Sequence, residues 1–226
     1  MDKKLIILLC VLILVIIITI FILKKIYSGH KNLYNKFDYF YNNKVDYIGN
    51  QNIKDSKEGI KYSYSMMFYL VNLPANSIWN TDSDSPKTIM HSFGSPNIIY
   101  LRKDNKLQIE LAYRNNQGVL DLYVFDLENI ENQKWINLVV TVNDRKVHVY
   151  KNGLLVSSKS LPNVNMKSAK TITIGEKNNN FNGYFGMLDY YNYELNSVEV
   201  NKIYHKNIKK IPKKLLSYEE YIYLNK

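Results

Sequence analysis

The chain has 226 residues, a net charge of +10, 46% hydrophobic residues and one cysteine. This length leaves room for one domain with its own core after any targeting segment. A single cysteine excludes an intramolecular disulfide and a cysteine-built zinc site, and the basic balance favours anionic partners such as lipid headgroups or an acidic protein.

The stretch Leu5–Leu23 is an uninterrupted apolar segment without charge, proline or glycine. As a helix at about 1.5 Å per residue it spans roughly 28 Å, the hydrocarbon thickness of a bilayer. A cleaved signal peptide has a shorter apolar region and a small-residue cleavage site, and a core helix has a polar face, whereas Thr19 is the one polar side chain here. Residues 1–25 are therefore predicted to be a signal-anchor helix, with the lipid bilayer as partner through Leu5–Leu23.

The residues that flank this segment favour one side of the membrane for the rest of the chain. Lysines are more numerous after the segment than before it, which places the domain on the cytosolic side by the positive-inside rule. The chain has no N-x-S/T sequon despite its many asparagines, and it lacks the cysteines of a disulfide-bonded secreted domain. We expect a cytosolic domain, or its topological equivalent inside a particle.

Residues 26–59 are polar and aromatic and are predicted to be a connector. Tyr34, Phe37, Phe40 and Tyr41 stand at helical spacing, which is typical of an amphipathic helix on the headgroup surface. The alternative, which we favour, is a stalk followed by the first edge strand of the domain.

From Lys61 the apolar period changes to two, which predicts strands. Residues 61–70 alternate until Pro74, and a long polar loop, Trp79–Lys87, follows. Further strands are predicted at 88–93, 97–102, 107–113 and 119–126. The turn Lys103-Asp104-Asn105 makes a hairpin of the second and third of these.

The segment Trp135–Ser160 gives the clearest strand signal. Asn143-Asp144 and Asn152-Gly153 divide it into three strands, and Asn-Gly tolerates the positive φ of a type I′ turn. Strands at 171–175 and 183–193 follow. Residues 196–206 have helical spacing, with Asn196 as N-cap and Glu199 completing a capping box. Residues 207–226 are predicted to be a basic, mobile tail.

About ten short strands with tight turns and little helix predict an all-β fold, a two-sheet antiparallel sandwich with a short C-terminal helix. Inner-face positions are assigned to Trp135, Val139, Thr141, Val147 and Val149. His91 and His148 are interpreted as surface or strand-edge residues.

Two segments also resemble a known family. Residues 135–156, WINLVVTVNDRKVHVYKNGLLV, are similar to the central meander of laminin G-like and concanavalin A-like jelly rolls. The segments ITIGE and FNGYFGMLDYYNYELNSVEVNKIY are similar to their closing part, on Gly186, Leu188, Asp189, Tyr193 and Glu199. The resemblance covers residues 60–206 and implies a jelly-roll sandwich there.

The resemblance also implies candidate site residues. Family members often hold calcium at the sheet rim with carboxylates and carbonyls, and Asp82, Asp84 and Asp104 stand in loops suited to such a rim. Asp189 matches the acidic residue of the family, but Tyr190 replaces its frequent acidic neighbour. The loop residue Trp79 is a candidate for stacking on a sugar ring. Calcium is the one cofactor considered.

Catalysis is not expected, because glycosidases of this fold place paired carboxylates on one strand face. Asp121 and Asp126 have odd spacing and point to opposite faces, and Glu110 is alone. The sequence also shows no nucleophile elbow, phosphate-binding glycine loop or metal-spaced histidine pair.

Three functions are weighed. The first is a non-enzymatic, single-pass membrane protein for adhesion or assembly, a structural component of the membrane of a large DNA virus particle with a capsid or other membrane protein as partner. The second is a membrane-anchored lectin, and the third is a degenerate glycosidase. Nucleic acid is not an expected partner, because no recognised binding motif is present.

Overall fold

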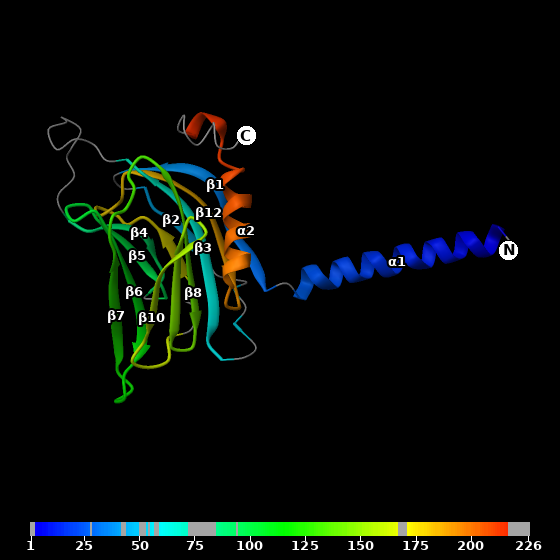
Figure 1. Cartoon of the computed structure of the whole chain (residues 1–226), viewed down its shortest axis with the longest axis horizontal. Coiled ribbons are helices and arrows are strands. Elements are labelled where there is room, and N and C mark those ends of the chain that lie inside the picture. Colours follow the sequence, from blue (N-terminus) through cyan, green and yellow to red (C-terminus); the bar gives the residue numbers. More distant parts are fainter. Residues whose placement is uncertain are drawn as a thin grey trace.

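In the computed structural model, the described residues are 3–27, 29–41, 44–49, 53, 55–56, 59–71, 85–93, 95–166 and 171–216. The N-terminal helix α1 (Lys3–Tyr27) precedes a two-layered β-sandwich (Figure 1). Among the described residues, no helix qualifies by length and hydropathy as a membrane span.

Two six-stranded antiparallel sheets form the sandwich, as predicted. The first sheet contains, in spatial order, β1 (His30–Phe40), β12 (Gly183–Tyr191), β3 (Lys61–Leu70), β8 (Trp135–Asn143), β9 (Lys146–Lys151) and β10 (Leu154–Ser160). The second contains β2 (Asp46–Gly49), β11 (Thr171–Ile174), β4 (Lys87–His91), β5 (Asn97–Leu101), β6 (Lys106–Arg114) and β7 (Leu120–Leu127).

The main core lies between the two sheets and is built from alternate residues of the strands. On β3 the inward side chains include Tyr62, Tyr64 and Phe68, and on β8 they include Ile136 and Val140. Burial of such aromatic and aliphatic side chains contributes about 1.5–3 kcal/mol each. The predicted inner positions Val147 and Val149 are confirmed.

Residues 26–59, predicted as a connector, supply the edge strands β1 and β2. The favoured edge-strand alternative agrees with β1, which pairs with β12, whereas the amphipathic-helix interpretation is wrong. Register shifts between Asn32 and Tyr34 and between Tyr34 and Phe37 interrupt this pairing. Such irregularities change the direction in which side chains point. Aromatic residues spaced three apart in the sequence can therefore belong to a strand, although this spacing is typical of a helix.

The prediction that Trp135, Val139 and Thr141 face the inner core is wrong. Trp135 and Val139 belong to two smaller clusters on the outer face of the first sheet. Thr141 lies two residues after Val139 on β8 and therefore points to the same outer face. Both faces of β3 and β8 are buried, because α2 (Ser197–Ile208) covers the outer one. A strand that is apolar on both faces does not reveal in sequence which face points inward.

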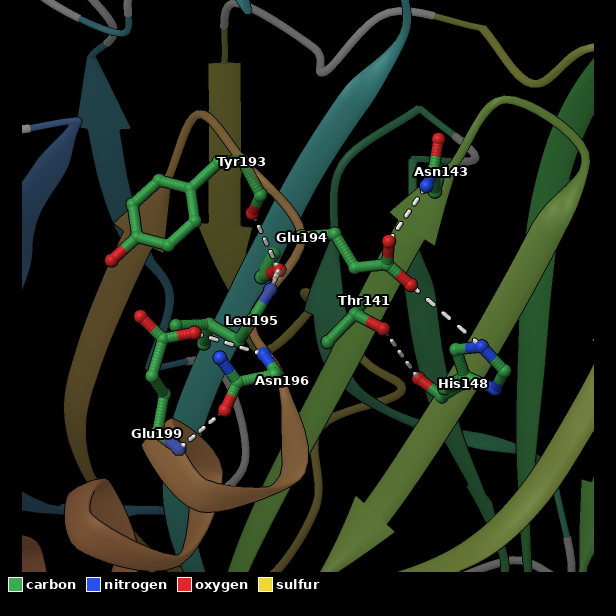
Figure 2. A network of polar contacts seen from close by, with 9 residues as sticks. Thr141, Asn143, His148, Tyr193, Glu194, Leu195, Asn196 and Glu199 are labelled. Atoms are coloured by element: carbon green, nitrogen blue, oxygen red, sulfur yellow. Dashed lines mark hydrogen bonds and ion pairs between the residues drawn. The ribbon is translucent and has the colours of Figure 1, made fainter.

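Helix α2 begins with the predicted capping box, which is confirmed. The Asn196 side chain accepts a hydrogen bond from the Glu199 amide at 3.0 Å, and the Glu199 carboxylate accepts one from the Asn196 amide at 2.9 Å (Figure 2). Just before the cap, the Ser63 hydroxyl donates to the Tyr193 carbonyl and accepts from the Leu195 amide. These contacts fix the start of α2 on strand β3.

A second contact in the same network holds the β12–α2 connection to the neighbouring strands. The Asn143 amide donates to Glu194 Oε2 at 2.6 Å, and His148 Nε2 lies 3.7 Å from Glu194 Oε1 (Figure 2). Glu194 therefore links the helix entrance to both β8 and β9.

The C-terminal segment is not a mobile tail as far as residue 216. Residues 209–216 include a short 3-10 turn, η1 (Lys213–Leu215), and continue the cover over the first sheet. Ile211 is buried against Ile208, and Trp135 Nε1–H donates to the Leu215 carbonyl at 2.9 Å. A buried indole has a polar N–H that needs a hydrogen-bond partner, and the Leu215 carbonyl supplies it.

Candidate functional site

The predicted calcium residues are not assembled into a site by the described part of the chain. Trp79, Asp82 and Asp84 lie outside the described residues. Asp104 is exposed in the β5–β6 turn of the second sheet, whereas Asp189 is buried on β12 of the first sheet. Among the described residues, no three His, Cys, Asp or Glu side chains come together as a metal-binding group.

Asp189 holds the first edge strand in place. Its Oδ1 atom lies 2.9 Å from His30 Nε2 and accepts a hydrogen bond from Asn32 Nδ2 at 2.8 Å, and the side chain is only 8% exposed. The His30 ring stacks on Tyr191, with 4.7 Å between ring centroids. Burial, and then the Asp189 charge, raise the pKa of the Tyr191 phenol well above its usual value. The Asp189 carboxylate thus ties the start of β1 to β12.

The acidic residues considered for hydrolysis are each in contact with another side chain. The Tyr113 hydroxyl donates to Asp121, and this hydrogen bond is the largest cause of the raised pKa of Tyr113. Glu110 accepts hydrogen bonds from Asn97 at 2.9 Å and from Gln108 at 3.0 Å. Asp126 lies opposite Gln108 on the other strand face from Asp121, as the odd spacing predicts.

One flank of the sandwich exposes aliphatic side chains on two edge strands. Leu154, Leu155 and Val156 of β10 are 68%, 54% and 45% exposed, and they are consecutive, so both faces of the strand contribute. On β7, Leu120, Leu122 and Val124 are exposed on one face. We call these six residues the aliphatic flank.

The two strands of the aliphatic flank lie on the same side of the molecule. They are the terminal strands of the two sheets. The other terminal strand is β1 in the first sheet and β2 in the second. Because β1 ends at Phe40 and β2 begins at Asp46, these two strands lie on one flank of the sandwich. Strands β7 and β10 therefore lie on the opposite flank (Figure 1). Exposed, apolar edge strands are template surfaces for a second chain, which natural proteins otherwise shield.

The outer face of the second sheet carries a row of aromatic side chains. Thr173 of β11 pairs with Tyr47 of β2 on one side and with His91 of β4 on the other. Tyr47 is 75% exposed, and the exposed ring of Phe93 lies 4.9 Å from that of His91. Since strands are about 4.8 Å apart, the row spans about 10 Å from Tyr47 to His91. Flat rings on an uncovered sheet can stack on a planar or cyclic ligand.

Neither surface was identified from sequence. The run LLV after the Asn-Gly turn is visible in the sequence, but whether a strand lies next to it depends on the sheet order. The aromatic row depends on the pairing of β11 with β2 and β4, which joins residues far apart in the chain.

A small hollow is also present near the start of β3. It is lined by Asp55, Ser56, Gly59, Ile60, Lys61, Tyr62 and Tyr190 and has a volume of about 10 Å³ for water-sized probes. A space of this size holds about one water molecule and is far below a small-molecule site.

Comparison with known proteins agrees with this fold. The laminin G family model described as the concanavalin A-like lectin/glucanases superfamily matches residues 42–201. The chain belongs to this family. The match begins before β2, which extends the concanavalin A-like region further toward the N-terminus than the predicted start at residue 60. No curated protein matches the chain.

Solved structures with this fold include neurotoxin binding domains. The botulinum neurotoxin serotype G binding domain has a TM-score of 0.56 and 15% identity over 80% of this chain and 47% of its own. The serotype D binding domain has a TM-score of 0.56 and 17% identity, over 79% and 46%. The receptor binding domain of mosaic serotype C/D has a TM-score of 0.54 and 17% identity, over 78% and 50%. The chain spans about half of their length, and at this identity the likeness shows the fold alone.

The structural role of Asp189 predicts the effect of removing its carboxylate. In Asp189→Ala, the two contacts of this buried carboxylate with His30 and Asn32 are lost, and we expect a loss of about 2–4 kcal/mol in the free energy of unfolding. The exposed Asp104→Ala is the matched control and should change it by less than about 0.5 kcal/mol. Chemical denaturation of the full chain in detergent measures both. Equal effects, or a calcium-dependent stabilisation that Asp189→Ala abolishes, would contradict the structural role.

Proposed function

We propose that this chain is a non-enzymatic, single-pass membrane protein whose concanavalin A-like sandwich binds a protein partner for adhesion or assembly. The single observation that carries the binding proposal is the aliphatic flank. Its leucines and valines offer apolar contact and edge-strand backbone, which suit a polypeptide, but few of the hydrogen bonds that sugar hydroxyls need.

The anchoring part of the proposal rests on α1. Its described central side chains, from Val11 to Ile18, are aliphatic and exposed, and such a surface requires an apolar environment. Only residues 28 and 29 separate the end of α1 from β1, a distance of at most roughly 10 Å at about 3.5 Å per residue. The domain is therefore held directly at the lipid surface.

The side of the membrane and the setting follow from sequence features. The absence of sequons and of domain cysteines supports a domain on the cytosolic side or inside a particle. A structural role in the membrane of a large DNA virus particle, with a capsid or other membrane protein as the partner, agrees with this placement. We expect no calcium requirement.

The proposal of no enzymatic activity rests on the acidic residues. Asp121 and Asp126 occupy opposite strand faces, and Glu110 is engaged by two amides. Paired acid and base carboxylates facing one cleft, as glycoside hydrolysis requires, are not formed by these three.

Site-specific crosslinking tests the aliphatic flank. A photo-crosslinking amino acid at Leu155 and, in a second variant, at Leu122 should give adducts with the same partner in native membranes, because both residues face one flank. The matched control is Val198, an exposed aliphatic residue of α2 on the covered side of the sandwich. Identical adducts from all three positions, or none from the flank positions, would show that the flank is not the binding surface.

Glycan binding is the second candidate function, and the aromatic row favours it. We expect the full chain in detergent to give no signal on a glycan array. A specific signal that falls at least about tenfold in Tyr47→Ala, Trp79→Ala or Asp82→Ala, the loss of about 1.4 kcal/mol of binding, would favour a lectin instead. Leu155→Ser serves as the control, since it alters only the flank.

A further inference from the structure

A cluster of positive charge lies along α2 and the segment that follows it. Six lysines lie close together between residues 202 and 214, a stretch that contains no arginine, and the fold holds this stretch against the first sheet. This lysine ridge consists of Lys202, Lys206, Lys209, Lys210, Lys213 and Lys214, all exposed.

The ridge is presented by a rigid platform rather than by a loose tail. Lys202 and Lys206 stand one turn apart on the solvent side of α2, and Lys209 is the C-cap residue of the helix. The opposite side of the same segment is buried through Ile208 and Ile211, and the hydrogen bond from Trp135 to the Leu215 carbonyl fixes its far end. The charges are therefore held in a fixed array before any partner arrives.

Little within the described protein neutralises this array. Residues 200–216 contain no Asp or Glu. The salt bridges found between described residues use lysines elsewhere, at Lys44, Lys106 and Lys151. Six like charges on one surface raise the local positive potential, which an anionic surface relieves.

The position of the ridge relative to α1 indicates the partner. Helix α2 covers the outer face of the first sheet, and β1, which begins directly after α1, is an edge strand of that sheet. The Asn192 amide donates to the Gly29 carbonyl at 2.8 Å, so the end of α1 is tied to the turn that leads into α2. Figure 1 shows α1 leaving the sandwich on the side where α2 lies.

We propose that the lysine ridge docks the domain flat on anionic lipid headgroups of the membrane that holds α1. This inference rests on the proposed membrane anchoring. Lysines are point charges that suit a diffuse layer of headgroups, whereas nucleic-acid recognition favours arginine forks, which the ridge does not offer. Because α1 already tethers the chain, the second contact is intramolecular and needs only modest affinity.

The test uses the full chain in lipid nanodiscs of phosphatidylcholine alone or with 30% phosphatidylserine. The rate of amine acetylation is measured for each lysine by mass spectrometry. With phosphatidylserine, the ridge lysines should react at least about fivefold more slowly, and 0.5 M NaCl should abolish the difference, because the Debye length then falls to about 4 Å. The exposed Lys103, Lys146 and Lys159 should react equally in both discs.

Two charge-matched variants sharpen the test. In K202E/K206E/K209E, the remaining ridge lysines should lose their protection from acetylation. Each lysine near an anionic surface raises the affinity for that surface about fivefold, so the loss of three lowers the affinity about a hundredfold. In K103E/K146E/K159E, which changes the net charge equally, the protection should persist.

The outcomes separate this inference from the anchoring on which it rests. If alkaline carbonate extracts the chain from membranes, the anchoring proposal fails. If the chain stays inserted but the ridge lysines react equally in both discs, the docking proposal is overturned. It is likewise overturned if a short DNA duplex, and not phosphatidylserine, protects these lysines.

Discussion

The contact between the Trp135 indole and the segment after α2 determines which surfaces of this protein remain open. The indole lies among Met67, Met187, Ile208 and Ile211 and donates its N–H to the Leu215 carbonyl. Together with the capped start of α2, this contact closes the outer face of the first sheet. Among the described residues, the outer face of the second sheet, the flank formed by β7 and β10, and the outside of α2 are left uncovered and open to a partner.

As a result, this domain presents three surfaces of different chemical character. The flank is aliphatic, the open sheet carries an aromatic row, and the outside of α2 carries lysines. Under the proposed anchoring, the domain can use the lysine surface toward lipid and the flank away from it without conflict. The family relationship and the neurotoxin binding domains of similar structure agree on the fold of this domain.

Local sequence chemistry predicted most of the strands because their signals are short-range. The Asn152-Gly153 turn has positive φ at both residues, and the Asn196–Glu199 box forms as expected, since each needs only neighbouring residues. The face of Trp135 was mistaken because β8 is apolar on both sides. The helical spacing of Tyr34 and Phe37, on which the less favoured helix interpretation rested, arises because irregular pairing in β1 re-aims those side chains. These errors arise from tertiary contacts that one sequence does not record.

The candidate site was less predictable than the fold. Asp189 was singled out through the family resemblance as a calcium candidate, but its observed partners His30 and Asn32 lie more than 150 residues away in the chain, so these contacts could not be predicted. Four of the six ridge lysines belong to the predicted basic tail, but the sequence did not show that Ile211 anchors this part of the chain against the first sheet.

The most direct test of the central claim is the environment of Trp135 in a Trp79→Phe background, where it is the sole tryptophan. In the full chain its fluorescence should be blue-shifted and protected from acrylamide quenching. In a chain that ends at Lys209, emission should shift to the red and quenching should rise severalfold, while the β-sheet circular dichroism is retained. Unchanged emission and quenching in the shortened chain would contradict the account, because the first sheet would then not depend on this segment for its cover.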